Sequence, residues 1–288
     1  MVNVLSVDVE EYFHPSEVQR FIDTDWSTLP SRVEWQTMQI IELFARHDVK
    51  ATFFIVGWIA EKHPHVVRAI ANAGHEIGCH SYAHRLVYEL SPTDFRRDTQ
   101  RCVDLITDAC GAQVRAYRAP SYSITKESMW ALEILAELGF THDSSIYPIK
   151  HDRYGIPGFP RHAHVINTAS GPICEVPIAT VVFSSGRTAP VGGGAYLRLL
   201  PYRYTAAGIR KLHNEKQPAC VYFHPWEIDP DQPKLASSMI ARIRTYTGLH
   251  SMMHKLDRLL TEFDFSTMTD VHATVLPAEA ARALVAFA

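Results

Sequence analysis

The chain of 288 residues has few of the features that mark secreted, membrane or nucleic-acid-binding proteins. Its five cysteines are odd in number and widely spread, without a CxxC pair, so neither a zinc ribbon nor a redox motif is indicated. No apolar run approaches the ~18 to 20 residues of a membrane span. Because 28 Lys and Arg face 31 Asp and Glu without blocks of one sign, nucleic acid and anionic membrane are poor partners.

The N-terminal sequence MVNVLSVDVEEYF has no basic leader before a long apolar core, which argues against an ordinary signal peptide. Unpaired cysteines fit reduced thiols, so we expect a cytoplasmic protein without a membrane span. An apolar content of 47% is enough to bury the core of one large domain or two modest ones.

Short apolar runs alternate with amphipathic segments along the chain, a rhythm typical of βα units around a parallel sheet or barrel. The predicted strands cover residues 2–9, 51–57, 75–80, 114–120, 173–183 and 219–225. The predicted helices cover residues 32–48, 65–74, 93–111, 127–139, 205–216 and 248–263, and an apparent strand and an Ala-rich tail follow the last of them.

Two segments rich in Pro and Gly, residues 147–164 and 184–201, interrupt this rhythm. Long loops in βα architectures usually decorate the face that binds substrate. No linker or repeat separates a second domain.

Three carboxylates end the first predicted strand in SVDVEEYF. Alternate side chains of a strand share a face, so Asp8 and Glu10 should point the same way and Glu11 the opposite way. Two like charges held together cost energy, which a cation beside them would remove.

The sequence HSYAH places His80 and His84 at the end of another predicted strand. If a helical turn begins there, residues i and i+4 share a face and both imidazoles can reach one ion. Two histidines and a carboxylate are a common catalytic zinc set, which Glu10 would complete. Alone, the two histidines could equally be coincidental helix residues.

Three further residues follow apolar stretches. Arg118 has a guanidinium fork that suits a buried carboxylate such as Asp8, although it could be a surface residue before a Pro turn. Asp143 could be a functional residue or merely a helix cap or turn Asp. His224, with Trp226 close by, could be functional or an ordinary core histidine.

The order and spacing of these stretches resemble the five motifs of the polysaccharide deacetylases, the NodB homology or carbohydrate esterase family 4 group. The motifs are SVDVEEYF, HSYAH, RAPSYS, HDSSIYP and VYFHPWE. The resemblance covers roughly residues 1–226. The surrounding sequence resembles more narrowly the subgroup found with exosortase-linked (PEP-CTERM) exopolysaccharide clusters, which has a C-terminal extension.

The resemblance implies a single-domain α/β protein with a distorted (β/α) barrel. Residues 1–226 would form the catalytic domain, and residues 227–288 a helical C-terminal extension packed on it. It further implies a metal-dependent hydrolase that removes N-acetyl groups from N-acetylhexosamine units of a polysaccharide or its lipid-linked precursor, in exopolysaccharide biosynthesis. The partner would be a carbohydrate, with peripheral contact to a lipid-linked glycan allowed.

By the same resemblance, Asp8 would be the general base, held in place by Arg118. Glu10, His80 and His84 would hold a divalent metal, expected to be Zn²⁺, with Co²⁺ and Ni²⁺ as alternatives. The family's common motif has adjacent aspartates, whereas Val9 stands between the two carboxylates here.

The remaining roles also come from the resemblance. His224 would protonate the leaving nitrogen, and Asp143 would pair with it. A backbone N–H of Ser121 or Tyr122 would stabilise the oxyanion, since Ser121 intervenes where the family usually has Tyr after Pro. Trp226 and Tyr122 could offer aromatic faces to a sugar ring.

Three other functions stay open from the sequence. The same ligand set occurs in non-haem Fe(II) oxygenases, although these are usually β-sandwiches. An amidase or deformylase of this fold could act on another C–N amide. A non-catalytic sugar-binding relic would be expected to lose the base or the acid, and both are present.

Overall fold

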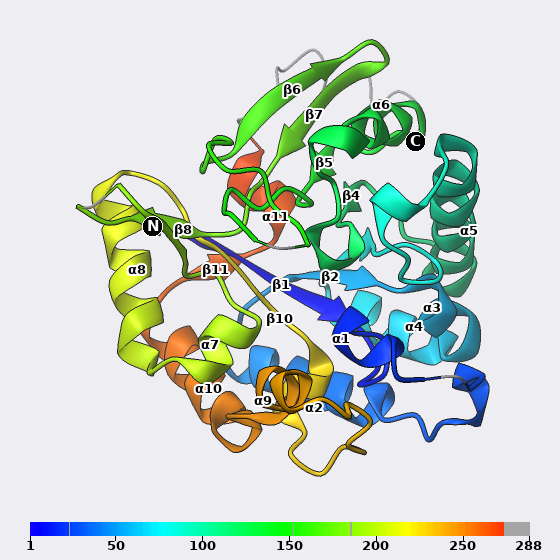
Figure 1. Cartoon of the computed structure of the whole chain (residues 1–288), viewed down its shortest axis with the longest axis horizontal. Helices are drawn as coiled ribbons and strands as arrows, with labels where there is room; N and C mark the ends of the chain where they lie inside the picture. The colour runs from blue at the N-terminus through cyan, green and yellow to red at the C-terminus, as the bar shows by residue number, and fades with distance from the viewer. Residues whose placement is uncertain (23, 152, 185, 274–288) are drawn as a thin grey trace.

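Strand β1 (Asn3–Val9) is entirely buried and lies inside a mainly parallel sheet, between β10 (Cys220–Phe223) and β2 (Thr52–Ile55). The computed structural model describes residues 1–22, 24–151, 153–184 and 186–273. The sheet curls into a partial barrel, which confirms the predicted fold class (Figure 1).

The strands of this sheet follow the order β10-β1-β2-β3-β4-β5-β7-β6, and β11 also pairs with β1. All of these pairs are parallel except β6 with β7. The other strands of the sheet are β3 (Glu76–Cys79), β4 (Ala116–Tyr117), β5 (His142–Asp143), β6 (His164–Thr168), β7 (Gly171–Glu175) and β11 (Phe265–Ser266). A separate hairpin consists of β8 (Thr180–Val182) and β9 (Thr188–Pro190).

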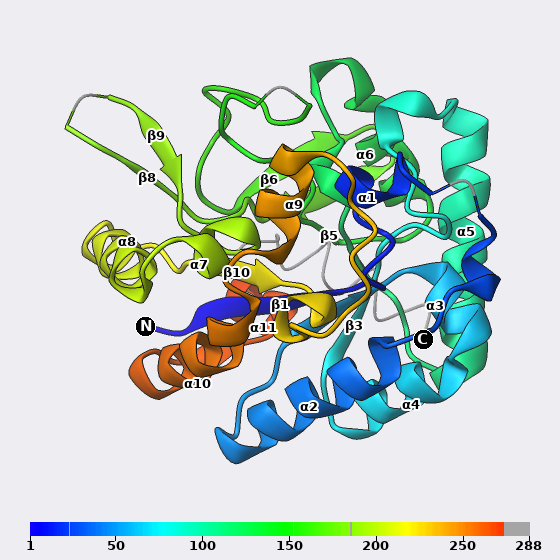
Figure 2. The same cartoon turned by 60° about the horizontal axis from the view of Figure 1, so that its bottom comes forward.

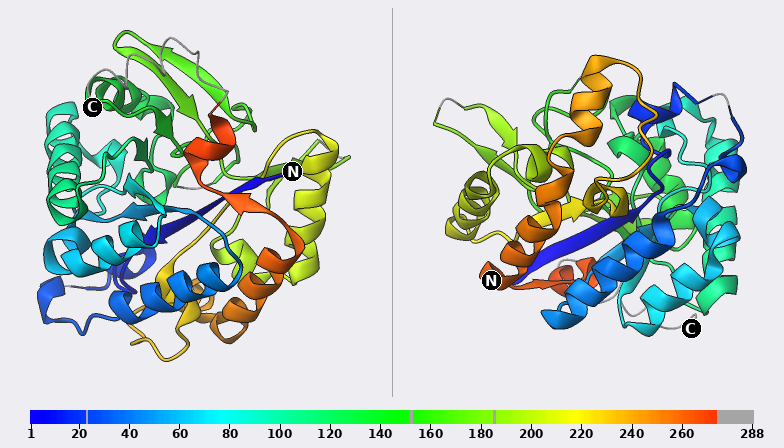
Figure 3. Two further views of the ribbon diagram at one scale, coloured as in Figure 1. Left: turned by 180° about the vertical axis from the view of Figure 1, so that it is seen from behind. Right: turned by 90° about the horizontal axis from the view of Figure 1, so that it is seen from below.

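Helices surround the curled sheet. The α-helices are α1 (Ser16–Gln19), α2 (Val33–Arg46), α3 (Gly57–Lys62), α4 (Pro64–Asn72), α5 (Pro92–Cys110), α6 (Trp130–Glu137), α7 (Ala195–Leu199), α8 (Tyr202–Asn214), α9 (Met239–Tyr246), α10 (Met252–Glu262) and α11 (Met268–His272). Neighbouring helices α2, α4, α5 and α6 follow one another around the outside (Figure 2). Helix α10 packs against α7, on the other side of β1 (Figure 3).

The two faces of β1 meet different surroundings, as its alternation predicts. Leu5, Val7 and Val9 belong to the main core, which the surrounding helices complete. Val4 belongs to a smaller cluster inside the curl, together with Phe54. The site residues Asp8 and Glu10 continue the inner face, so the strand directs them into the barrel.

One predicted strand is wrong in its extent. The segment 173–183 divides into β7, which belongs to the main sheet, and β8, which belongs to the hairpin. Pro177 stands between them, and proline lacks the N–H that a continuous ladder requires.

The predicted loop 184–201 contains β9 and α7, and its three consecutive glycines approach β10 closely. Gly193 forms a bridge with Tyr222, and a Cβ on Gly193 would lie 1.8 Å from the Tyr222 carbonyl oxygen. Only glycine fits there, and the contact brings α7 beside the end of β10.

The C-terminal segment packs on the same sheet. Strand β11 pairs with β1 in the register Asn3 with Phe265, and α11 contacts β1. The last part of the expected extension, residues 274–288, lies outside the described residues. All five cysteines are free. Within the described ranges, no helix is both long and apolar enough to cross a membrane.

Three buried histidines predict a loss of stability in acid. Burial lowers the pKa of His75, His142 and His272 to about 4. Each folded pKa lies below the unfolded value of about 6.5, so the unfolded chain binds protons first and stability falls as the pH drops from about 6.5 to 4. The cost reaches on the order of 3 kcal/mol for each histidine.

Urea unfolding followed at pH 7.5 and at pH 5 measures this loss. The His142→Gln variant should show a shallower pH dependence than the wild type because it lacks one of the three groups. Equal stability of the wild type at both pH values would contradict the expectation.

Candidate active site

The end of β1 presents its carboxylates to opposite faces, as predicted. Asp8 and Glu10 are buried on the inner side, whereas Glu11 is buried on the outer side. Glu11 accepts hydrogen bonds from the backbone N–H groups of Arg32 and Val33, at 3.1 and 3.2 Å. It therefore caps the N-terminus of α2, where a negative charge is favourable.

His80 and His84 both reach Glu10, although the predicted helical turn is wrong. The segment after β3 consists of bends, and Ser81 and His84 have positive φ angles of 63° and 50°. His80 Nε2 lies 3.2 Å and His84 Nε2 2.9 Å from Glu10 Oε1. The convergence depends on this folded-back loop and not on helical periodicity.

The three side chains fit a divalent metal. His80 Nδ1 donates to the carbonyl oxygen of Arg118 at 2.7 Å, so Nε2 of the neutral ring turns a lone pair toward Glu10. Glu10 Oε2 is buried without a hydrogen-bond partner among the described residues. Two ligands of one zinc ion stand roughly 3.3 Å apart, close to the observed spacings. The donor set is the 2-His-1-carboxylate set of catalytic zinc.

Charge also favours an ionised ligand at Glu10. Burial raises the pKa of this carboxyl, but the imidazoles of His84 and His224 outweigh burial and hold the pKa well below its usual range.

Arg118 is completely buried and contacts Asp8 as predicted. Its Nη1 donates to Asp8 Oδ1 at 2.6 Å and to Ser6 Oγ at 2.8 Å, and its Nη2 donates to Ser144 Oγ at 2.9 Å. The guanidinium lies 4.3 Å from the centroid of the Phe54 ring. These contacts fix one Asp8 oxygen and leave the other facing the site.

Gly78 leaves space for the contact between the Phe54 ring and Arg118. A Cβ on Gly78 would lie 2.5 Å from the Phe54 ring, so the small residue in β3 lets the ring sit under Arg118.

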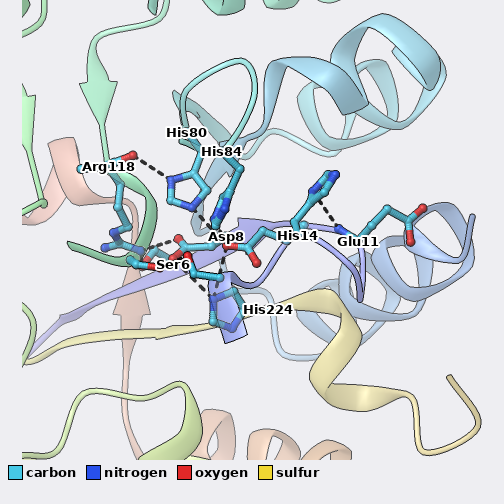
Figure 4. A network of polar contacts seen from close by, with 12 residues as sticks. Ser6, Asp8, Glu11, His14, His80, His84, Arg118 and His224 are labelled. Carbon is cyan, nitrogen blue, oxygen red and sulfur yellow. Dashed lines mark hydrogen bonds and ion pairs between the residues drawn. The ribbon is translucent and has the colours of Figure 1, made fainter. Parts of the chain in front are cut away.

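His224 follows β10 and lies across the site from the two histidines of the loop (Figure 4). Its Nε2 is 3.6 Å from Glu10 Oε1 and 4.0 Å from Asp8 Oδ2. Its ring stacks on Trp226 with a centroid distance of 5.0 Å. Burial lowers the pKa of His224, but nearby carboxylates, Glu10 foremost, outweigh burial and raise the pKa to about 9.

The predicted pairing of Asp143 with His224 is wrong. Asp143 ends β5 and is completely buried, and it accepts hydrogen bonds from Ser145 Oγ at 2.5 Å and Ser145 N at 3.2 Å. The neighbouring carboxyl is Glu175 of β7. The Nδ1 of His224 instead contacts Glu227 Oε2 at 3.1 Å.

Ser121 and Tyr122 lie in a strained turn at the edge of the site, with φ angles of 51° and 53°. The Tyr122 N–H donates to the Ala119 carbonyl oxygen at 3.0 Å. Among the described residues, the Ser121 N–H makes no backbone hydrogen bond. Ser121 is therefore the better placed of the two to offer an N–H to a ligand.

A cleft of about 280 Å³ opens over these groups. Both predicted loops contribute to it, through His151, Arg153 and Tyr154 of the first and Tyr196 of the second. The tyrosine predicted to contact sugar, Tyr122, is 5% exposed and packs against other tyrosines. Trp226 is equally buried and its ring stacks on His224, so both rings line the cleft with little exposed surface.

Sequence reasoning missed three residues around the site. Gln19 of α1 donates its side-chain N–H to His14 O and contacts His84 Nδ1 at 3.3 Å. Glu227 and Arg198 lie behind His224. The HPWE sequence held a usable signal for Glu227, since residues i and i+3 eclipse each other in a 3-10 turn.

Two parts of the chain match known protein families. Residues 25–142 match the family model described as polysaccharide deacetylase. This part of the chain is therefore similar to polysaccharide deacetylase domains. Residues 144–273 match a domain of unknown function, DUF3473. The deacetylase match contains His80, His84 and Arg118, whereas the DUF3473 match contains His224.

One similar protein is the peptidoglycan-N-acetylglucosamine deacetylase of Bacillus cereus, 34% identical over 34% of this chain and 36% of that protein. The matched regions span 36% to 55% of the first curated relatives' own length.

Two solved structures share the fold. A structure assigned to the polysaccharide deacetylases from Mycobacterium smegmatis has a TM-score of 0.64 and 16% identity, covering 96% of this chain and 91% of that one. The Puue allantoinase has a TM-score of 0.62 and 15% identity, covering 95% and 91%. The fold is therefore shared by a structure assigned to the polysaccharide deacetylases and by an allantoinase.

Proposed function

We propose that the protein is a metal-dependent hydrolase that removes N-acetyl groups from N-acetylhexosamine units of a carbohydrate. One observation carries the proposal: Glu10 forms a 2-His-1-carboxylate group with His80 and His84 and lies beside His224, which also neighbours Asp8. One cleft is lined by Asp8, Glu10, His84 and His224. The deacetylase domain match supports a carbohydrate substrate.

Residues of the chain account for each proton transfer. Asp8 takes a proton from the attacking water while the oxygen of that water bonds to the carbonyl carbon of the amide. His224 then gives its proton to the nitrogen as the C–N bond breaks, which yields acetate and the free amine. The neighbouring carboxylates, Glu10 and Glu227 among them, raise the pKa of His224 and so favour the form of the ring that carries this proton. The Ser121 N–H is placed to stabilise the oxyanion.

A metal at Glu10, His80 and His84 would polarise the carbonyl and lower the pKa of a bound water. We expect Zn²⁺, with Co²⁺ and Ni²⁺ as alternatives, because nitrogen and oxygen donors accept all three.

The substrate proposal has a finer form. The sequence around the motifs resembles the subgroup linked to exopolysaccharide clusters, so we propose a polysaccharide or its lipid-linked precursor as the substrate. Five free cysteines support a cytoplasmic location. We keep residues 1–226 as the proposed catalytic domain, with residues from 227 onward packed on it.

The second candidate is an amidase or deformylase that acts on another C–N amide. The allantoinase likeness shows that the fold accommodates such proteins, and the catalytic groups would be the same. A non-catalytic sugar-binding relic is less favoured because Asp8 and His224 line one cleft together with Glu10 and His84 of the metal-binding group.

Acetate release from chito-oligosaccharides, with the new amines labelled in parallel, tests the proposal. We expect equal amounts of acetate and amine, loss of activity after treatment with a chelator, and recovery on addition of Zn²⁺. Activity that survives complete removal of metal would overturn the metal mechanism. Turnover of formamides or ureides, without acetate release from any acetylated glycan, would favour the second candidate.

A further inference from the structure

His224 is held by a residue three positions further along the chain. Glu227 Oε2 lies 3.1 Å from His224 Nδ1 and also accepts the His224 backbone N–H at 3.1 Å. The Glu227 N–H donates back to the His224 carbonyl oxygen at 3.0 Å. The 3-10 turn Pro225–Ile228 thus fixes the imidazole so that Nε2, and not Nδ1, faces the cleft.

Glu227 is in turn held by a buried arginine. Arg198 Nε donates to Glu227 Oε1 at 2.9 Å, and both side chains are completely buried. The two remaining nitrogens of Arg198 donate to the carbonyl oxygens of Arg244 and Thr247. A buried ion pair of this kind needs further hydrogen bonds to offset desolvation, and each of the three guanidinium nitrogens of Arg198 donates one.

The neighbours of Glu227 favour the ionised form of its carboxyl group. Burial raises the pKa of the carboxyl, but the hydrogen bond with His224 and the charge of Arg198 outweigh burial and lower the pKa. Glu227 is therefore a carboxylate at neutral pH and accepts the Nδ1 proton of His224.

His224, Glu227 and Arg198 all lie in the segment that matches DUF3473. Arg198 comes from α7, which the glycines at 192–194 bring to β10, and its carbonyl partners come from the end of α9. Lys255 of α10 donates to the Arg198 carbonyl oxygen at 2.7 Å, which ties α7 to the C-terminal helices. Asp143, which the family resemblance places beside His224, instead accepts a hydrogen bond from Ser145 Oγ.

We propose that Glu227, anchored by Arg198, is the positioning residue that aims the His224 proton at the leaving nitrogen. The DUF3473 segment then supplies the acid half of the site, and the deacetylase match with β1 supplies the base and the metal-binding group. This inference rests on the proposed function.

The dependence on the leaving group tests the positioning role. An amide nitrogen must be protonated before it leaves, whereas the phenolate of 4-nitrophenyl acetate leaves without a proton. For Glu227→Gln we expect kcat for chito-oligosaccharide deacetylation to fall by about 10²-fold with KM nearly unchanged. Hydrolysis of the aryl ester by the same variant should stay close to the wild-type rate. Glu227→Asp should recover part of the amide activity.

Glu76→Gln is the control, because Glu76 is a partly buried carboxylate at the N-terminal end of β3 and is not among the residues that line the cleft. It should keep the wild-type ratio of amide to ester rates. An equal loss of both rates in Glu227→Gln would overturn the positioning role and indicate a structural one. A wild type that hydrolyses the ester but no acetylated glycan would overturn the proposed function itself.

Discussion

Asp8→Asn should lower kcat for acetate release by about 10²- to 10⁴-fold. The amide oxygen of Asn can still accept the Arg118 hydrogen bond that Asp8 Oδ1 accepts at 2.6 Å, so the local structure should persist. What is lost is the ability to take a proton from water. Steady-state kinetics on a chito-oligosaccharide, with metal content measured on the same sample, separates this loss from a loss of metal.

Glu11→Gln is the control for this variant. Glu11 is also a buried carboxylate at the end of β1, but it faces α2 and holds the N–H groups of Arg32 and Val33. Its replacement should reduce stability and leave kcat nearly unchanged. If Asp8→Asn retained wild-type kcat, Asp8 would not be the base.

Removal of a metal ligand is the second large effect. His84→Ala takes away an imidazole whose Nε2 lies 2.9 Å from Glu10 Oε1, and we expect the purified variant to lack stoichiometric metal. Since the metal contributes several kcal/mol to catalysis, activity should fall by more than about 10²-fold, to the level of the chelated wild type. Elemental analysis and acetate release measure the two losses.

A second histidine group provides the comparison. Glu34, His63 and His65 also bring three ligand atoms within 4.8 Å of one another, but on the surface of the protein. His63→Ala should keep full activity and the metal at Glu10. An active His84→Ala without metal would contradict the assignment of the ligand set.

The inner face of the site could be predicted from the sequence because strand alternation is a local rule. It separates Asp8 and Glu10 from Glu11 without knowledge of the rest of the fold, and the structure agrees. The meeting of His80 and His84 at Glu10 was predicted for the wrong reason. The chain turns between them through bends at Tyr82 and Ala83, with positive φ at Ser81 and His84, and no periodicity in HSYAH indicates such a conformation.

The acid half of the site was harder to predict. Asp143 lies at the expected place in the chain, but its carboxylate accepts a hydrogen bond from Ser145 Oγ. Arg198 follows three glycines in a segment without apolar periodicity, and its role depends on a contact between residues 29 positions apart. Only the tertiary packing of α7 against the turn after β10 reveals that pair.

The two-residue spacing of Asp8 and Glu10 has a consequence for how such sites change in evolution. In an extended strand two residues advance about 6.6 Å, so the pleat itself sets the separation of the two carboxylates. A chain with carboxylates at adjacent positions would have to leave the extended conformation there to turn both inward. Insertion of a single residue between Asp8 and Glu10 would turn Glu10 to the outer face, so the inward direction of both carboxylates depends on the phase of this strand more than on the identity of Val9.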